Sequence, residues 1–185
     1  RAGRRCGAGK CGAVTASHTG EHHCKNCPAG QYRDATGHTD CVPCAAGRYQ
    51  SETGETSCAK CPGGKFTPTT SIHNSKCKSC AVGRFQPDDE KTSCKACPAG
   101  RFGESTGLAN EQCSGICTSG YYCTAGSTSA TQQVCGAASV FCPAGSTAPK
   151  VVAAGHYTVP ANTDATIRTG EARCEAGYYC TVRTQ

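Results

Sequence analysis

Five Cys-x-x-Cys pairs recur along this chain at an almost constant pitch. Successive pairs begin 17 or 19 residues apart, and a sixth pair, with one extra residue between its members, follows at the same spacing. A period of this kind indicates a repeat array in which each unit is one small supersecondary structure. The pairs are Cys24 and Cys27, Cys41 and Cys44, Cys58 and Cys61, Cys77 and Cys80, Cys94 and Cys97, and finally Cys113 and Cys117.

The chain has too few apolar side chains for an ordinary hydrophobic core. Leu, Ile, Val and Phe together number 17 of 185 residues, a fraction that normally predicts disorder. The 19 cysteines offer another source of stability. A disulfide that closes a loop of about 15 residues removes roughly 3 kcal/mol of unfolded-state entropy. We therefore predict that reduction unfolds the chain.

The cysteine content also predicts the compartment. Disulfides persist in oxidising surroundings and are rare in the cytosol, so we expect an extracellular or cell-surface location. No apolar run approaches the roughly 18 residues that span a bilayer, and we expect no membrane segment within this chain. The sequence contains no Met and begins at Arg1, which predicts a processed product or a fragment of a longer array.

Each cysteine pair is followed by the same short motif. A glycine stands three residues after the second cysteine, and an aromatic residue stands two residues after the glycine. Glycine suits turns that need positive φ, and a second Gly-containing turn precedes most of the following pairs. The pattern predicts one short β-hairpin per repeat. The repeat aromatics are Tyr32, Tyr49, Phe66, Phe85 and Phe102.

The motif Cys-x-x-Cys-Pro-x-Gly-x-Tyr resembles the ephrin-receptor-like cysteine-rich repeat, which is itself similar to the first submodule of TNF-receptor-type repeats. The resemblance covers roughly residues 24–117. It implies a small disulfide-rich β fold, an elongated array of short β-hairpin repeats with little helix. It implies a setting at a cell surface or in an extracellular matrix, including the large extracellular proteins of algae and other protists. The resemblance carries no catalytic activity.

Three regions are expected. Residues 1–23 form a basic N-terminal segment, residues 24–116 form the five-repeat array, and residues 117–185 form a longer unit and the start of the next. The last region contains Cys-x-x-Gly-Tyr-Tyr-Cys twice, 57 residues apart. Between these blocks, short strands are predicted at 151–152, 157–159 and 166–168.

The sequence permits two disulfide connectivities for the array. One is a series of single rungs that join Cys27 to Cys41, Cys44 to Cys58, and so on to Cys97 with Cys113. The other pairs first with third and second with fourth cysteines, as in Cys24–Cys41 with Cys27–Cys44. Resemblance to the TNF-receptor submodule favours the rungs, and every unit is then equivalent. The predicted framework comprises Cys24, Cys27, Cys41, Cys44, Cys58, Cys61, Cys77, Cys80, Cys94, Cys97, Cys113, Cys117, Cys123, Cys135, Cys142, Cys174 and Cys180.

Two cysteines precede this framework, and the total is odd. We expect Cys6 and Cys11 to pair with each other or with Cys24. At least one of the 19 cysteines then has no partner within the chain, and it is expected to bond another subunit or a cysteine beyond the fragment.

Chemistry other than cross-linking is disfavoured. Zinc ribbons use thiolate pairs at this spacing but rarely run to five even pairs, and such a cysteine content is extreme for a reducing compartment. A thioredoxin-like role needs a βαβ scaffold, which the pattern does not predict. No histidine has metalloprotease spacing or lies near a plausible nucleophile. We expect no enzyme activity, no catalytic residue, no metal and no cofactor.

The surface residues suggest few specific partners. The net charge is +6, but nucleic acid is not expected because the aromatic residues belong to the repeat and provide no stacking platform. The acidic run 88–90 is interpreted as a solvated turn rather than a calcium loop. No asparagine begins an N-glycosylation sequon. Candidate O-glycosylation sites, which would make the chain a glycoprotein, are Thr67, Thr69, Thr70, Ser127, Thr128 and Ser129.

These patterns predict an extracellular structural repeat module of a surface appendage, sheath or fibre. Each repeat is expected to contact only its neighbours, as in other repeat arrays. The expected partners are other copies of the chain or neighbouring repeats of a longer parent. The alternative is a ligand-binding or adhesion ectodomain of a cell-surface receptor, in which side chains that differ between repeats contact a protein ligand.

Overall fold

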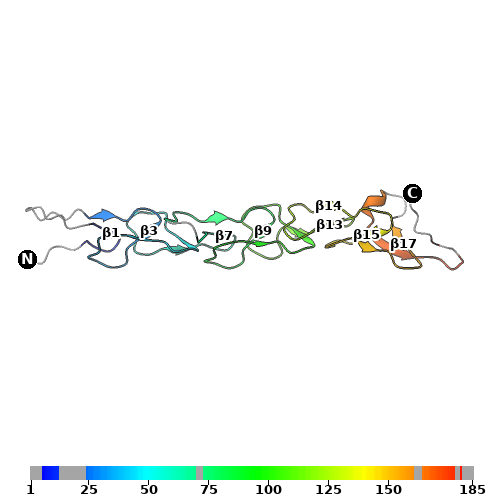
Figure 1. The fold of residues 1–185 in the computed structure, drawn as a ribbon, viewed down its shortest axis with the longest axis horizontal. Helices are drawn as coiled ribbons and strands as arrows, with labels where there is room; N and C mark the ends of the chain where they lie inside the picture. Colours follow the sequence, from blue (N-terminus) through cyan, green and yellow to red (C-terminus); the bar gives the residue numbers. More distant parts are fainter. Residues whose placement is uncertain (1–5, 13–23, 70–72, 161–163, 178–179, 181–185) are drawn as a thin grey trace, which may run out of the picture. The chain divides into compact units, whose positions relative to one another are not determined.

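A computed structural model describes residues 6–12, 24–69, 73–160, 164–177 and 180 (Figure 1). Among these residues the secondary structure consists of two-stranded antiparallel hairpins and one short 3-10 helix, with no α-helix. The fold is a small disulfide-rich β fold made of hairpin repeats, as the sequence predicts. An isolated two-stranded hairpin is marginal in water, so the cross-links between these hairpins matter for stability.

Most strands are only two residues long, and each pairs with its neighbour in the sequence. The pairs are β1 (Lys10–Cys11) with β2 (Lys25–Asn26), β3 (Gln31–Tyr32) with β4 (Val42–Pro43), β5 (Arg48–Tyr49) with β6 (Ala59–Lys60), β7 (Lys65–Phe66) with β8 (Lys78–Ser79), β9 (Arg84–Phe85) with β10 (Lys95–Ala96), β11 (Arg101–Phe102) with β12 (Gly115–Ile116), β13 (Tyr121–Tyr122) with β14 (Gln133–Val134), β15 (Val140–Phe141) with β16 (Lys150–Val151), and β17 (His156–Val159) with β18 (Gly170–Arg173).

The chain divides into two compact units. The first comprises Arg1–Cys80 and Gln86–Cys94, and the second comprises Ala81–Phe85 and Lys95–Gln185. Each unit contains hairpins of the same kind, in which the repeat aromatic ends the first strand of its hairpin.

A hydrogen-bonded turn precedes the first strand of each repeat hairpin. In the third repeat, for example, the N–H of Lys65 donates to the carbonyl of Pro62 at 3.0 Å, and Gly64 between them has φ +79°. Positive φ at this third turn position is the requirement of a type II turn, which explains why glycine recurs there. The sequence motif therefore encodes the turn that starts the hairpin.

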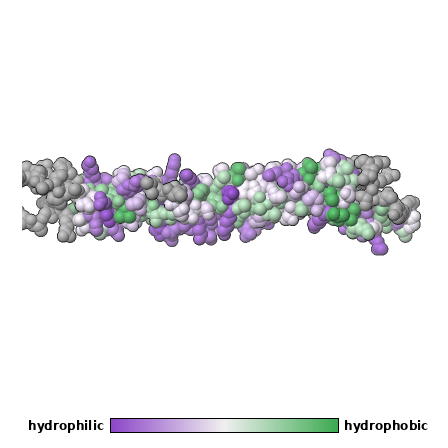
Figure 2. All heavy atoms as spheres, in the orientation of Figure 1, coloured by the Kyte–Doolittle hydropathy of each residue, from purple (hydrophilic) through white to green (hydrophobic). Residues whose placement is uncertain are grey.

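Sulfur takes the place of a hydrocarbon core. Of the thirteen buried apolar residues among those described, eleven are cysteines, and the others are Phe85 and Phe141. Hydrophilic and neutral side chains cover most of the described face in Figure 2, and hydrophobic areas there are small. This distribution matches a chain that cannot bury enough apolar surface by itself.

The segment between Cys142 and Cys174 contains a β unit, although one predicted strand is wrong. Strands β16 and β17 overlap the predicted positions, but residues 166–168 do not extend as a strand. A 3-10 helix, η1 (Ala165–Ile167), lies there instead. The Asp164 side chain accepts a hydrogen bond from the N–H of Thr166 at 2.8 Å, and this local cap favours the helical turn.

Candidate functional site

The disulfides join each repeat to the next. The structure contains the single-rung connectivity, in which the second cysteine of one pair bonds the first cysteine of the following pair. The Cα atoms of these pairs lie 5.6–6.1 Å apart, within the range that a disulfide requires. The rungs are Cys27–Cys41, Cys44–Cys58, Cys61–Cys77, Cys80–Cys94 and Cys97–Cys113.

The remaining pairs are local or lie at the N-terminal end. In the second unit the bonds close short loops: Cys117–Cys123, Cys135–Cys142 and Cys174–Cys180. Cys6 bonds Cys24, one of the expected alternatives. Cys11 does not pair with Cys6 or Cys24 as expected, because hairpin β1–β2 carries it to Cys41 of the next repeat.

Backbone hydrogen bonds connect consecutive repeats at the repeat glycine. The carbonyl of Gly47 accepts a hydrogen bond of 2.8 Å from the N–H of Cys61. Cys61 is the second cysteine of the next pair. The same bond joins Gly30 to Cys44 at 2.9 Å and Gly64 to Cys80 at 2.8 Å. Since these are main-chain groups, the connection requires no particular side chain and recurs in every repeat of the array.

The repeats also contact the repeat after the next one, so the expectation of contacts between neighbours alone is wrong. A Cβ atom on Gly47 would overlap with the carbonyl of Glu90, which lies two repeats further along the chain. Gly30 has the same relationship to His73. The contact arises because the turn before each cysteine pair folds back over the array. His73 and Glu90 take φ values of +58° and +60° there.

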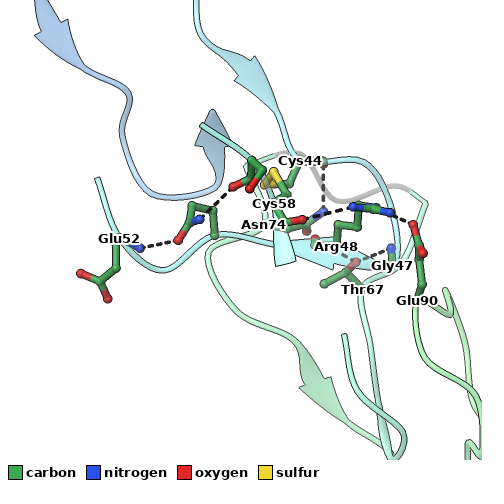
Figure 3. Close-up of a disulfide and its surroundings, with 10 residues drawn as sticks. Cys44, Gly47, Arg48, Glu52, Cys58, Thr67, Asn74 and Glu90 are labelled. Atoms are coloured by element: carbon green, nitrogen blue, oxygen red, sulfur yellow. Dashed lines mark hydrogen bonds and ion pairs between the residues drawn. A yellow bond between two sulfur atoms is a disulfide. The ribbon is translucent and has the colours of Figure 1, made fainter. Parts of the chain in front are cut away.

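Glu90 also joins these distant repeats through its side chain (Figure 3). Its carboxylate accepts a hydrogen bond from Arg48 Nε. Its other oxygen lies 3.0 Å from Lys60 Nζ. The hydrogen bond from Arg48, with a further one from Lys60, lowers the pKa of Glu90 from its ordinary value of 4.5. The carboxylate is therefore charged at neutral pH. We name Arg48, Lys60 and Glu90 the ion cluster.

The rest of the acidic run 88–90 is also occupied within the molecule. Asp89 Oδ1 accepts a hydrogen bond from the N–H of Gly63 at 2.9 Å. Asp88 Oδ2 lies 3.7 Å from Lys91 Nζ. The Asp88 carboxylate thus interacts within the turn, and the Asp89 carboxylate binds the backbone of an earlier repeat.

Two polar side chains are buried beside the Cys44–Cys58 rung (Figure 3). Thr67 is 1% exposed, and its Oγ1 accepts a hydrogen bond from the N–H of Gly47 at 2.6 Å. Asn74 is 6% exposed, and its Nδ2 donates to the carbonyl of Cys44 at 3.4 Å. The N–H of Gly47 has a second, longer hydrogen bond of 3.3 Å to the backbone carbonyl of Thr67. The two side chains thus add hydrogen bonds to backbone groups of the second repeat.

Burial corrects part of the candidate glycosylation set. Thr67 and Ser127 are each 1% exposed, and the hydroxyl of Ser127 donates to the carbonyl of Thr124 at 2.8 Å. A glycan does not fit on either hydroxyl. Thr69, Thr128 and Ser129 are exposed, and Thr70 lies outside the described residues.

The repeat aromatics lie at equivalent places. Tyr32, Tyr49, Phe66 and Phe102 are partly exposed, whereas Phe85 is 5% exposed. Phe85 also forms a β-bridge with Leu108.

Sequence reasoning missed a three-sulfur cluster in the first unit. The Sγ atoms of Cys11, Cys27 and Cys41 lie within 4.8 Å of one another. A signal was available, because Cys6-Gly-Ala-Gly-Lys-Cys11 has the spacing of the repeat motif with cysteine at the aromatic position. Three thiolates would suit a soft metal, but a disulfide within the cluster leaves only one thiol, which favours sulfur exchange.

The family match agrees with this geometry. The family described as tyrosine-protein kinase ephrin type A/B receptor-like matches residues 15–47, 34–72 and 69–113. The chain belongs to this family. Ephrin-receptor-like repeats of this disulfide-rich kind are typically non-enzymatic. Together with the disulfides, the family indicates an extracellular disulfide-rich module.

No curated protein matches the chain. Within the described residues, no helix has the length and apolar character needed to cross a membrane.

Proposed function

We propose that this ephrin-receptor-like chain is a structural repeat module of an extracellular appendage, sheath or fibre, and that it acts as a disulfide-stapled filament subunit. Its partners are other copies of the chain or neighbouring repeats of a longer parent. The observation that carries the proposal is the recurrence of one set of contacts, in which the rung and the glycine carbonyl are the same from repeat to repeat.

The contacts suit a mechanical role. Each rung closes a loop of 14 or 16 residues, so a pulling force reaches a covalent bond before that loop extends. Between rungs, the glycine hydrogen bonds and the contacts two repeats away resist separation of the repeats. Since stability in such arrays is a sum over repeats and their interfaces, length can increase without a new core.

Electron microscopy of native material under non-reducing conditions tests this function. The same sample is imaged after mild reduction, and a third portion is alkylated without reduction as the control. Ordered filaments that survive alkylation and separate on reduction would support the proposal. Isolated, monodisperse particles at high concentration would overturn the filament role.

The second candidate is a ligand-binding or adhesion ectodomain. The large hydrophobic side chains exposed among the described residues all belong to the second unit, and exposed apolar surface is a feature of interaction sites. They are Val82, Ile116, Val134, Val151 and Tyr157, with Val151 76% exposed. A saturable partner found at monomer concentrations, with binding lost in Val151→Ser but kept in Val42→Ser of the first unit, would favour this candidate.

A further inference from the structure

Cys11 occupies the position of the repeat aromatic. Gly9 has φ +76°, as the repeat glycine Gly30 has φ +83°, and Cys11 follows Gly9 by the same two residues that separate Tyr32 from Gly30. The strand register is also the same, since Cys11 lies opposite Lys25 as Tyr32 lies opposite Val42. The first hairpin therefore places a sulfur where later hairpins place a ring.

This substitution brings three sulfurs together. The Cα atom of Cys41 lies 5.7 Å from that of Cys11 and 5.6 Å from that of Cys27, and both separations suit a disulfide. A sulfur forms only one disulfide at a time. The other sixteen cysteines form eight pairs of their own. The odd cysteine of the chain therefore belongs to this cluster.

We propose that Cys11, Cys27 and Cys41 form a thiol–disulfide exchange site. In the resting arrangement Cys27 bonds Cys41, as the rung pattern requires, and Cys11 is the thiol. The Cys11 thiolate attacks Cys41 Sγ, the Cys11–Cys41 bond forms, and the Cys27–Cys41 bond breaks. The electron pair leaves on Cys27 Sγ, which takes a proton from water. One disulfide replaces another, so the step needs no oxidant or reductant.

The exchange changes whether the free thiol is exposed to solvent or buried. Cys27 is fully buried, whereas Cys11 is partly exposed. At the partly exposed Cys11 position, water can solvate a thiolate. A thiolate at the buried Cys27 position is disfavoured by desolvation. The accessible arrangement is therefore preferred, and exchange hides the thiol.

In its accessible arrangement the site takes a disulfide-bearing ligand. The Cys11 thiolate attacks one sulfur of the ligand, the ligand disulfide breaks, and a mixed disulfide forms on Cys11. The other half of the ligand leaves as a thiolate. This reaction attaches a partner covalently without reducing any rung, and it does not depend on the proposed filament function.

Thiol counting in the oxidatively folded chain tests the exchange. The wild-type chain is expected to carry one thiol, and Cys11→Ser none. In Cys27→Ser, Cys11 is expected to bond Cys41, so the count is zero. The matched control is Cys44→Ser, which removes the partner of Cys58 in a repeat that has Tyr32, and no cysteine, at the position equivalent to Cys11. Its thiol count is expected to rise to two. A count of two for Cys27→Ser, with Cys41 alkylated, would overturn the exchange.

A second measurement uses the unaltered protein and does not depend on folding of the variants. The wild-type chain is treated with 4,4′-dithiodipyridine, and the released thiopyridone and the modified peptide are identified. One equivalent of release with the adduct on Cys11 supports the proposal. No release, or an adduct on a cysteine outside the three, overturns it.

Discussion

The carboxylate of Glu90 accepts a hydrogen bond from the guanidinium of Arg48, although 42 positions of sequence separate the two residues. This sequence separation corresponds to two repeats. The backbones of the same two repeats already meet where Gly47 lies against the carbonyl of Glu90, and the hydrogen bond adds a side-chain contact there. The array thus gains connections that a purely nearest-neighbour arrangement lacks.

The ion cluster predicts a pH-dependent stability. Arg48 and then Lys60 lower the pKa of Glu90, so the stabilisation is present at neutral pH and is lost as pH falls through the folded-state pKa, below the ordinary 4.5. Glu90→Gln should therefore lower the melting temperature at neutral pH, and its difference from wild type should shrink in acid. Thermal unfolding across this range measures the effect. A pH-independent difference would contradict it, and Glu104→Gln, an exposed glutamate, is the control.

Because Gly47 lies so close to the carbonyl of Glu90, adding one methyl group at this position should greatly lower the free energy of unfolding. Gly47→Ala adds both positive-φ strain, at +79°, and overlap with the Glu90 carbonyl. Gly155→Ala separates the two effects, because Gly155 has φ +73° with nothing within 4 Å of the added atom. The control should lose about 1–2 kcal/mol, and Gly47→Ala should lose more. Denaturant unfolding compares them, and equal losses would show that the overlap is relieved without cost.

The buried hydroxyl of Thr67 predicts a hydrogen-bond effect. Thr67→Val keeps the shape but removes the hydroxyl that accepts from the N–H of Gly47, which then keeps only its longer bond of 3.3 Å to the Thr67 carbonyl. The variant should be destabilised by about 1 kcal/mol. Thr67→Ser retains the hydroxyl and should lose less from this bond. Equilibrium unfolding of both variants decides the matter, since equal stability of Thr67→Val and wild type would mean that the hydroxyl contributes nothing.

The length of the loop that a disulfide closes predicts how much that disulfide contributes to the free energy of unfolding. The Cys44–Cys58 bond closes 14 residues, whereas the Cys117–Cys123 bond closes 6. Replacing both partners by serine should cost about 3 kcal/mol for the first and about 2 kcal/mol for the second. Unfolding free energies of the two double variants give the comparison. A greater loss for the short loop would indicate that packing, rather than chain entropy, governs these bonds.

The sequence alone determined the elements that depend on short stretches of chain. The cysteine pitch indicated the repeats and the family, the scarcity of apolar residues indicated a sulfur core, and the glycine three residues after each second cysteine indicated the turn. These features are readable because a turn and a two-residue strand involve neighbouring residues. The strand predicted at 166–168 failed for a similarly local reason, since Asp164 caps a 3-10 helix there.

Only the tertiary structure decided the relationships between distant residues. Two connectivities satisfied the spacing, and the hairpin register selected the rungs by placing Cys44 beside Cys58 rather than beside Cys27. The contact of Glu90 with Arg48 has no local signature, because the two residues are 42 positions apart. The repeat spacing of Cys6, Gly9 and Cys11 is a local signature of the hairpin, but it does not show that Cys11 reaches Cys41. The pitch specifies that sulfurs recur, and the folded chain determines which sulfurs meet.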